Sequence, residues 1–246
     1  ADDADIDLGT LAVTGAIALT TTDSAGNNSD ASIVNATAVN LAASSIKGNL
    51  LATATTGDLT DSGTVTVAGT AGFTTLADNA IINLDTLAVA GKIALTTTDS
   101  SGADSNATIV NTTAVDLNTS SVKGNLSATA TTGNLIDSGT VTATGSGTFI
   151  TLADNADIDL GTLAITGPIT LTTTDSSGAD SDASIVNASA LTLAASSVKG
   201  NLSATATTGN LTDSGTVTAT GTGTFITLAD DADIDLGTLA VTGAIA

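Results

Sequence analysis

The chain has 246 residues and a formal net charge of −21, from 25 acidic residues that are all Asp and four basic residues that are all Lys. This charge argues against binding to nucleic acid or to an anionic membrane, because both need clustered basic side chains. Cys and His are absent, which excludes disulfides, thiol catalysis and thiolate metal sites. No run approaches the roughly 20 apolar residues of a membrane-spanning helix.

The segment ADDADIDLGTLAVTGAIA opens the chain at Ala1–Ala18 and recurs unchanged at Ala229–Ala246. Related copies begin at Ala77 and Ala153, so the period is 76 residues. A fixed period of this length indicates stacked structural units rather than separate globular domains. We therefore expect one continuous solenoid over residues 1–246, cut from a longer array. Its repeats are residues 1–76, 77–152 and 153–228, followed by a partial fourth repeat, 229–246.

Short runs such as Leu11–Val13 and Val65–Val67 place apolar residues two apart, which is the spacing of a strand with one buried face. Helix is disfavoured because Thr, Ser, Asn, Asp, Gly and Val dominate. We assign the strands of the first repeat, coil by coil, to Leu11–Val13, Ile17–Leu19 and Ile33–Val34; to Val39–Leu41, Leu50–Ala54 and Leu59–Thr60; and to Val65–Val67, Phe73–Leu76 and Ile81–Leu84.

Apolar pairs begin at Leu11, Val39, Val65 and Leu87, and these steps of 28, 26 and 22 residues recur in the same order along the chain. A circuit of this length, with about three short strands, is typical of a right-handed parallel β-helix. The sequence therefore predicts an all-β solenoid with three coils per 76-residue repeat.

Internal copies indicate which positions face water. The residue after a recurring Gly is Ala16, Lys92 or Pro168, a variety that predicts an outward turn. Three further lysines recur in turns and mark solvated corners: Lys47, Lys123 and Lys199. The longest coil gains its extra length in three loops that we expect to protrude: Thr21–Ser32, Thr97–Thr108 and Thr173–Ser184.

Acidic segments are the candidate binding sites. In the third loop Asp175, Asp180 and Asp182, with Ser177 and Gly178, offer the oxygen ligands that Ca²⁺ prefers, although the EF-hand pattern is absent. The densest charge is the cluster Asp2, Asp3, Asp5 and Asp7, repeated as Asp230, Asp231, Asp233 and Asp235. We interpret both as solvated polar segments, with Ca²⁺ binding in the loops as the alternative.

The sequence gives little support for glycosylation, ice binding or catalysis. Glycosylation-type triplets at Asn35, Asn111 and Asn187 are expected by chance in a chain this rich in Asn, Ser and Thr. Outward Thr rows could bind ice, but Thr is also ordinary on an exposed strand. Paired Asp residues could serve glycoside hydrolysis only if two carboxyls had unlike environments. We assign no catalytic, cofactor-binding or metal-ligating residue and expect no enzyme.

The segment GNLSATATTGNLTDSGTVTATGTGTF at Gly200–Phe225, with copies from Gly48 and Gly124, resembles the repeats of giant secreted bacterial exoproteins of the filamentous-haemagglutinin type and related adhesins. The resemblance implies a β-helical shaft that is exported and displayed on the cell surface. We therefore expect a structural segment of a long extracellular fibre, which self-associates end to end and side by side. The alternative is a multivalent module that binds Ca²⁺ or a glycan through the Asp-rich loops.

Overall fold

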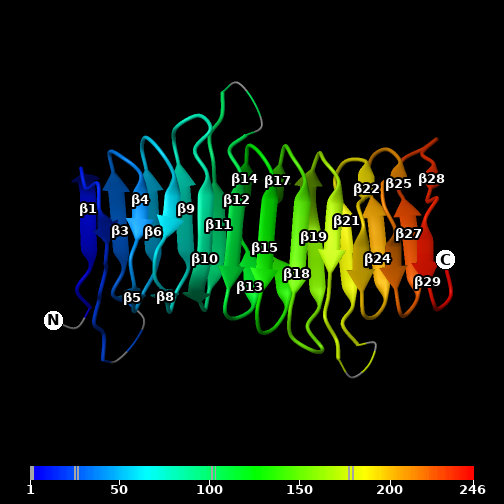
Figure 1. Cartoon of the computed structure of the whole chain (residues 1–246), viewed down its shortest axis with the longest axis horizontal. Coiled ribbons are helices and arrows are strands. Elements are labelled where there is room, and N and C mark those ends of the chain that lie inside the picture. The colour runs from blue at the N-terminus through cyan, green and yellow to red at the C-terminus, as the bar shows by residue number, and fades with distance from the viewer. Residues whose placement is uncertain are drawn as a thin grey trace.

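The computed structural model describes residues 3–24, 26, 28–100, 102, 104–176, 178 and 180–246. In this part of the chain every regular element is a β-strand, and the named strands pair in parallel across successive coils of a rod (Figure 1). The strands form two sheets, and the main path through each sheet crosses eleven strands. The predicted all-β parallel solenoid is confirmed. With neighbouring strands about 4.8 Å apart, eleven strands span about 48 Å.

The strands have the following bounds. The first sheet holds β1 (Ile6–Leu11), β3 (Ala31–Asn35), β6 (Leu50–Ala54), β9 (Ala71–Thr75), β11 (Lys92–Thr96), β13 (Val115–Leu117), β14 (Ser120–Val122), β16 (Leu135–Asp137), β17 (Val141–Ala143), β19 (Ile158–Ile165), β21 (Ala183–Asn187), β24 (Leu202–Ala206) and β27 (Gly223–Thr227). The second sheet holds β2 (Ala16–Ile17), β4 (Val39–Leu41), β5 (Ser44–Ile46), β7 (Leu59–Asp61), β8 (Val65–Val67), β10 (Ile82–Val89), β12 (Ala107–Asn111), β15 (Leu126–Ala130), β18 (Gly147–Thr151), β20 (Ile169–Thr172), β22 (Leu191–Leu193), β23 (Ser196–Val198), β25 (Leu211–Asp213), β26 (Val217–Ala219), β28 (Ile234–Asp235) and β29 (Leu239–Val241).

Most coils join two unlike walls. One wall is a single strand of four or five residues, such as β6, and we call it unbroken. The other wall, which we call split, is either two three-residue strands such as β7 and β8 or one eight-residue strand such as β10. The two forms are equivalent, because Ile82 of β10 pairs with Leu59 of β7 and Leu87 of β10 pairs with Val65 of β8.

The 76-residue unit contains an odd number of walls. From β3 to β11 there are four unbroken walls (β3, β6, β9 and β11) and three split walls (β4 with β5, β7 with β8, and β10). Two walls make one coil, so seven walls make three and a half coils. Accordingly, Ala31 and Ala183, two repeats apart, lie in the first sheet, whereas Ala107, the equivalent residue of the intervening repeat, lies in the second.

The prediction of three coils per repeat is therefore corrected to three and a half. The predicted stacking of Val65 beneath Leu87 is confirmed, but Val39 stacks on Leu59, in the other half of the split wall. Both halves of the split wall carry similar apolar pairs. The spacing of these pairs therefore predicts one column of stacked residues where the structure has two. The true partner of Val65 is Ser44, whose strand β5 was missed because it begins with a polar residue.

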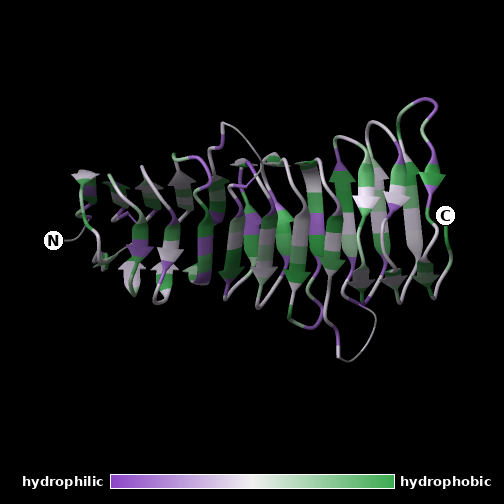
Figure 2. Cartoon of the chain, turned by 45° about the horizontal axis from the view of Figure 1, so that its top comes forward, coloured by the Kyte–Doolittle hydropathy of each residue, from purple (hydrophilic) through white to green (hydrophobic). Residues whose placement is uncertain are grey.

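The interior is a continuous stack of small and medium apolar side chains, visible as green bands that alternate with paler or purple bands along the strands (Figure 2). Each Phe lies between a small and a large residue of its column: Phe73 pairs with Ala52 on one side and Leu95 on the other. Phe149 repeats this arrangement between Ala128 and Leu171. Each large aliphatic side chain buried in this way contributes roughly 1.5–3 kcal/mol, so stability accumulates coil by coil.

The long loops leave the rod on alternate edges. The described residues of the loops 18–30 and 173–182 lie on one edge, the lower in Figure 1, and those of the loop 97–106 lie on the opposite edge (Figure 1). We call these the first and the second edge. The described parts of the three loops protrude from the rod, as expected, and the half coil in each repeat explains the alternation. The predicted outward turn is also confirmed, since Ala16, Lys92 and Pro168 are all exposed.

Candidate functional site

A buried asparagine in each repeat joins a split wall to an unbroken wall. Asn111 is fully buried, and its Oδ1 accepts a hydrogen bond of 2.9 Å from the backbone N–H of Val89. Its Nδ2 donates to the carbonyl oxygens of Val89 at 2.9 Å and Ala114 at 2.6 Å. If the next wall were also split, a backbone peptide group would form these two hydrogen bonds with Val89. The side-chain amide of Asn111 forms them instead. Asn35 and Asn187 make the same contacts with Val13 and Ile165.

A buried serine makes the opposite junction, from an unbroken wall to a split wall. Ser120 Oγ accepts a hydrogen bond of 3.0 Å from the backbone N–H of Leu95 and donates to the carbonyl oxygen of Asn118 at 2.8 Å. Ser44 and Ser196 repeat these contacts. We call the buried Asn and Ser residues adapters. Buried polar groups are costly unless they are paired, so the adapters stabilise the half coil by satisfying its backbone.

Outside the core, polar side chains form a ladder along one corner of the rod. The Oδ1 atom of Asn134 accepts from the N–H of Asp157, and Oδ1 of Asp157 accepts from the N–H of Asp182. Asp182 accepts in turn from Asn201, which accepts from Thr222, with N···O distances of 2.6 and 2.9 Å. Along this run, from Asn134 to Thr222, each coil therefore caps a backbone amide of the coil that follows it.

A second set of aspartates caps the corner inside the split wall. Asp213 accepts from the N–H groups of Gly237 and Thr238 and from the Thr238 hydroxyl, at 2.6 to 2.9 Å. The Thr238 hydroxyl and then the Gly237 amide hold the pKa of Asp213 below 3.8, because each bond favours the ionised carboxylate. Asp61 and Asp137 make the corresponding bonds in the earlier repeats.

The long loops also use their acids on the backbone. In the third loop, Asp175 accepts from the N–H of Gly178 and of Asp180, both at 3.0 Å. Asp182 belongs to the corner ladder, and Ser177 lies outside the described residues. Asp154, from the preceding coil, accepts from the N–H and hydroxyl of Ser176 and so tethers the loop.

The acidic clusters are spread over turns and ladder positions. Asp3 and Asp231 have a φ of 59°, the left-handed conformation that Asp and Asn tolerate best among side-chain-bearing residues. Asp5 caps the N–H of Asp30 at 2.8 Å, and Asp2 lies outside the described residues. Over the described ranges, no three acidic side chains are grouped as a metal site would require.

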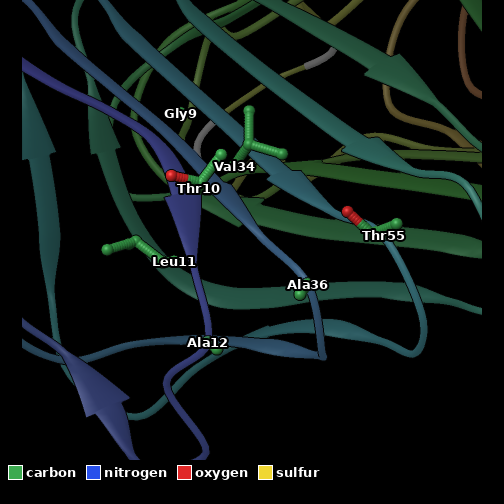
Figure 3. A pocket seen from close by; sticks show the side chains of 7 residues that line it. All are labelled: Gly9, Thr10, Leu11, Ala12, Val34, Ala36 and Thr55. Atoms are coloured by element: carbon green, nitrogen blue, oxygen red, sulfur yellow. The ribbon is translucent and has the colours of Figure 1, made fainter.

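Two shallow depressions occupy equivalent places in the first and third repeats. The first, about 330 Å³, lies beside Gly9 and Thr10 and is rimmed by Val34, Ala36 and Thr55 (Figure 3). Leu11 and Ala12 complete its lining. The second is lined by the equivalent residues: Gly161, Thr162, Leu163, Val186, Ala188 and Thr207, with Thr140. In the second repeat Asp85 and Thr112 replace the Gly and Ala. Neither depression brings together acid, base or nucleophile.

The structure also places the remaining sequence candidates. Asn35, Asn111 and Asn187 are buried adapters, so their Nδ2 atoms are inaccessible to glycosylation. Lys47 is exposed, while Lys123 and Lys199 are half-buried at corners. Outward hydroxyls align in rows that cross a few neighbouring strands. One such row is Thr108, Ser127, Thr148 and Thr170.

The adapters are the functional residues that sequence reasoning missed. Recurrence of Asn and Ser at fixed places in an otherwise apolar strand pattern was the available signal.

In the described part of the chain, no helix has the length and apolar character needed to cross a bilayer.

Comparison with known proteins gives one family. The model of repeats of unknown function named DUF5649 matches residues 26–96, 104–172 and 180–246. The chain belongs to the DUF5649 repeat family. The DUF5649 matches break within the second and third long loops. The first two matched units run from one loop to the next and hold the seven walls described above, whereas the third unit, residues 180–246, holds six walls. No curated protein and no solved structure matches the chain.

Proposed function

We propose that this chain is a structural segment of a long extracellular β-helical fibre, such as a surface filament, an adhesin stalk or a matrix strand. The observation that carries the proposal is the corner ladder. Its polar side chains are committed to the backbone of the next coil rather than gathered around a ligand. In such a structure the polar side chains of one coil accept hydrogen bonds from the backbone of the next coil, so the fold is suited to extension along one axis. The proposal assigns no catalysis to the chain.

The apolar residues of the last coils support end-to-end assembly. Ile234 and Ile245 are 49% and 58% exposed, whereas their interior equivalents Ile158 and Ile169 are buried. Together with Phe225, Leu236 and Leu239 they line an open apolar depression of about 330 Å³. We propose that adjoining coils of the same kind cover this surface, because unpaired strand edges and exposed apolar residues favour association.

The resemblance of Gly200–Phe225 to repeats of secreted exoproteins of the filamentous-haemagglutinin type supports a cell-surface address. A net charge of −21 favours a rod that stays solvated in an aqueous exterior. The absence of Cys makes the fold indifferent to an oxidising environment.

Immunolabelling of intact source cells tests the location, with labelling of permeabilised cells as the control. We expect antibody to the chain to label intact cells and protease to remove the signal. Labelling only after permeabilisation would overturn the proposal.

Thermal unfolding tests the alternative of a Ca²⁺-dependent module. We expect the same midpoint with millimolar Ca²⁺ and with chelator, whereas a large loss of stability on chelation would favour the binding module.

A further inference from the structure

The outer face of the first sheet carries almost no charge between β3 and β11. Strands β3, β6, β9 and β11 lie side by side there, and the one charged side chain that they carry is Lys92, at the start of β11. The other outward positions are small, apolar or hydroxyl residues: Ser32, Val34, Leu51, Thr53, Gly72, Thr74, Ala94 and Thr96. We call this surface the platform. In a chain of net charge −21, such a surface allows close approach of a second copy.

Two neighbouring residues of the platform differ together from the other repeats. Leu51 is 57% exposed and pairs with Gly72 on the next strand. A Cβ on Gly72 would lie 2.8 Å from Cδ2 of Leu51, so the leucine occupies space that a side chain at position 72 would need. The later repeats have a serine and a threonine instead: Ser127 with Thr148, and Ser203 with Thr224. The joint change leaves an exposed leucine on β6, the middle strand of the platform.

The platform also holds a projecting leucine and a depression in one column of residues. Leu76 directly follows β9 and is 49% exposed. It stacks on Thr55, since the residues that precede them are paired. Thr55 lies on the rim of the first depression, of about 330 Å³, together with Val34 and Ala36 (Figure 3). The leucine therefore follows β9 and the depression lies beside β3, and these are the two strands that flank β6.

We propose that two copies of this chain pair through their platforms, antiparallel, about a two-fold axis that runs along β6 between them. This axis places β9 of one copy over β3 of the other, and β11 over β1. Leu51 then meets Leu51 of the second copy, and Leu76 enters the depression of the second copy. The pair is closed, because both copies use the same surface and each contact occurs twice. The inference does not rest on the proposed extracellular role.

The charges at the margin of the platform are complementary under the same axis. The start of β11 lies opposite the start of β1 of the second copy. The first carries the exposed Lys92, and the second carries the exposed side chains of Asp5 and Asp7. Each copy therefore offers one cation to two carboxylates of the other. Charge complementarity of this kind gives specificity and fixes the register of the two rods.

The stoichiometry of the full chain is the first test. Repulsion between two rods of −21 is screened beyond about 8 Å at 0.15 M salt, so we expect pairs at physiological and higher salt and dissociation in low salt. Sedimentation velocity measures the association, and Ile245→Asp is compared because it disfavours end-to-end stacking. The proposal fails if the wild-type chain stays monomeric at every ionic strength, or if Ile245→Asp assembles beyond two copies.

Variants taken from the internal copies test the leucines while keeping the fold. Leu51→Ser with Gly72→Thr restores the pair of the other repeats and should weaken pairing about tenfold or more, because a central leucine is lost from both copies. Leu76→Ala should have a similar effect. Leu152→Ala is the matched control, since Leu152 is the equivalent residue one repeat later and is also 49% exposed, but follows β18 of the second sheet. Equal effects of Leu76→Ala and Leu152→Ala would refute the pairing.

Charge variants test the orientation of the two copies. Lys92→Ala introduces the residue found at Ala16. Asp7→Asn introduces the residue found at Asn83. Each should weaken pairing about twofold to fivefold, the range of an exposed ion pair. Lys92→Asp combined with Asp7→Lys should restore the pairing that each single reversal reduces. Thr148→Asp, on the second sheet, changes the net charge as much as Lys92→Ala and should leave pairing unchanged. The opposite result for the double reversal or for Thr148→Asp would contradict the antiparallel arrangement.

Cross-linking locates the two-fold axis directly. The chain has no cysteine, so Thr53→Cys on β6 gives a single reactive site and keeps Leu51 in place. In the proposed pair this site faces its own copy, and a short homobifunctional maleimide should join the two chains. Thr129→Cys is the control, because Thr129 is the equivalent residue of the next repeat and lies on β15 of the second sheet. Cross-linking of neither variant, or of both to the same extent, would overturn the proposal.

Discussion

Replacing Asn111 by Ala tests whether the adapters hold the half coil together. The substitution removes the acceptor of the Val89 N–H and a donor to the Ala114 carbonyl. The Val89 carbonyl keeps a hydrogen bond of 2.9 Å from the Thr113 hydroxyl, so the Val89 N–H is the main orphaned group. A buried group without a partner costs about 1–3 kcal/mol. Adding the weakened Ala114 carbonyl and the lost packing, we expect a loss of about 2–5 kcal/mol in the free energy of unfolding.

Thermal unfolding followed by circular dichroism measures the loss. A chain of this size shifts by about 2–4 °C per kcal/mol, so the midpoint should fall by roughly 4–20 °C if the rod unfolds as one unit. Amide exchange gives a local readout, and protection should fall first in β10 and β12. Asn118→Ala is the matched control. Ala42 and Ala194 occupy its position in the other repeats, and its effect should stay within about 0.5 kcal/mol.

The Asn111→Asp variant adds a dependence on pH. A buried carboxylate next to carbonyl oxygens has its folded-state pKa raised above the unfolded value of about 3.9. The variant should be penalised most above the raised pKa, where folding must bury the charge, and should regain stability as pH falls through that pKa. If Asn111→Ala unfolds at the same temperature as Asn118→Ala, the adapter reasoning is refuted.

Three further outcomes follow from the same contacts. A Cβ on Gly69 would lie 2.8 Å from the Gly48 carbonyl oxygen, so Gly69→Ala should lower the free energy of unfolding in urea by about 1–3 kcal/mol. As a control, Gly161→Ala should be nearly neutral, because no atom lies nearer than 4.0 Å to the added Cβ. Asp157→Ile introduces the residue found at Ile81 and removes the cap on the N–H of Asp182, so it should cost about 0.5–1.5 kcal/mol; an unchanged urea midpoint would count against the ladder. Asp213 has a lowered pKa, so its contribution to stability is present above pH 3.8 and is lost as pH falls through its folded-state pKa. Asp213→Asn should remove that acid sensitivity, as measured by acid unfolding against the wild type.

Much of the fold could be predicted because it rests on local patterns. The period of 76 residues, the strand spacing and the scarcity of helix formers lead to a parallel solenoid, and strands such as Leu50–Ala54 were placed with their observed bounds. Alternation of apolar residues reports which face of a strand is buried, but it does not report which coil a strand belongs to. That is why Val39 and Val65 were assigned to one column although they occupy two.

The sites were harder to predict because polar residues of one type have different tasks here. Asp175 closes a loop, Asp182 caps the next coil and Asp213 caps a split-wall corner. From their spacing in the sequence, these acids are interpreted as a set of ligands or as a cluster of charge. The spacing does not show that backbone N–H groups donate hydrogen bonds to their carboxylate oxygens. Asn111 has the same limitation: its triplet is that of a glycosylation acceptor, and only burial reveals the adapter.

The odd number of walls has a consequence for how such units vary in length. Removing one whole coil, for example residues 50–70, takes out β6, β7 and β8 and would place Ala71 directly on Ala31, both inward alanines. The unit would then have five walls, still an odd number, and its loops would still alternate between edges. Loss of a single wall would instead give a whole number of coils, leave an adapter without its junction and bring every loop to one edge. Gain or loss of whole coils therefore preserves the two-edged display, whereas gain or loss of one wall destroys it.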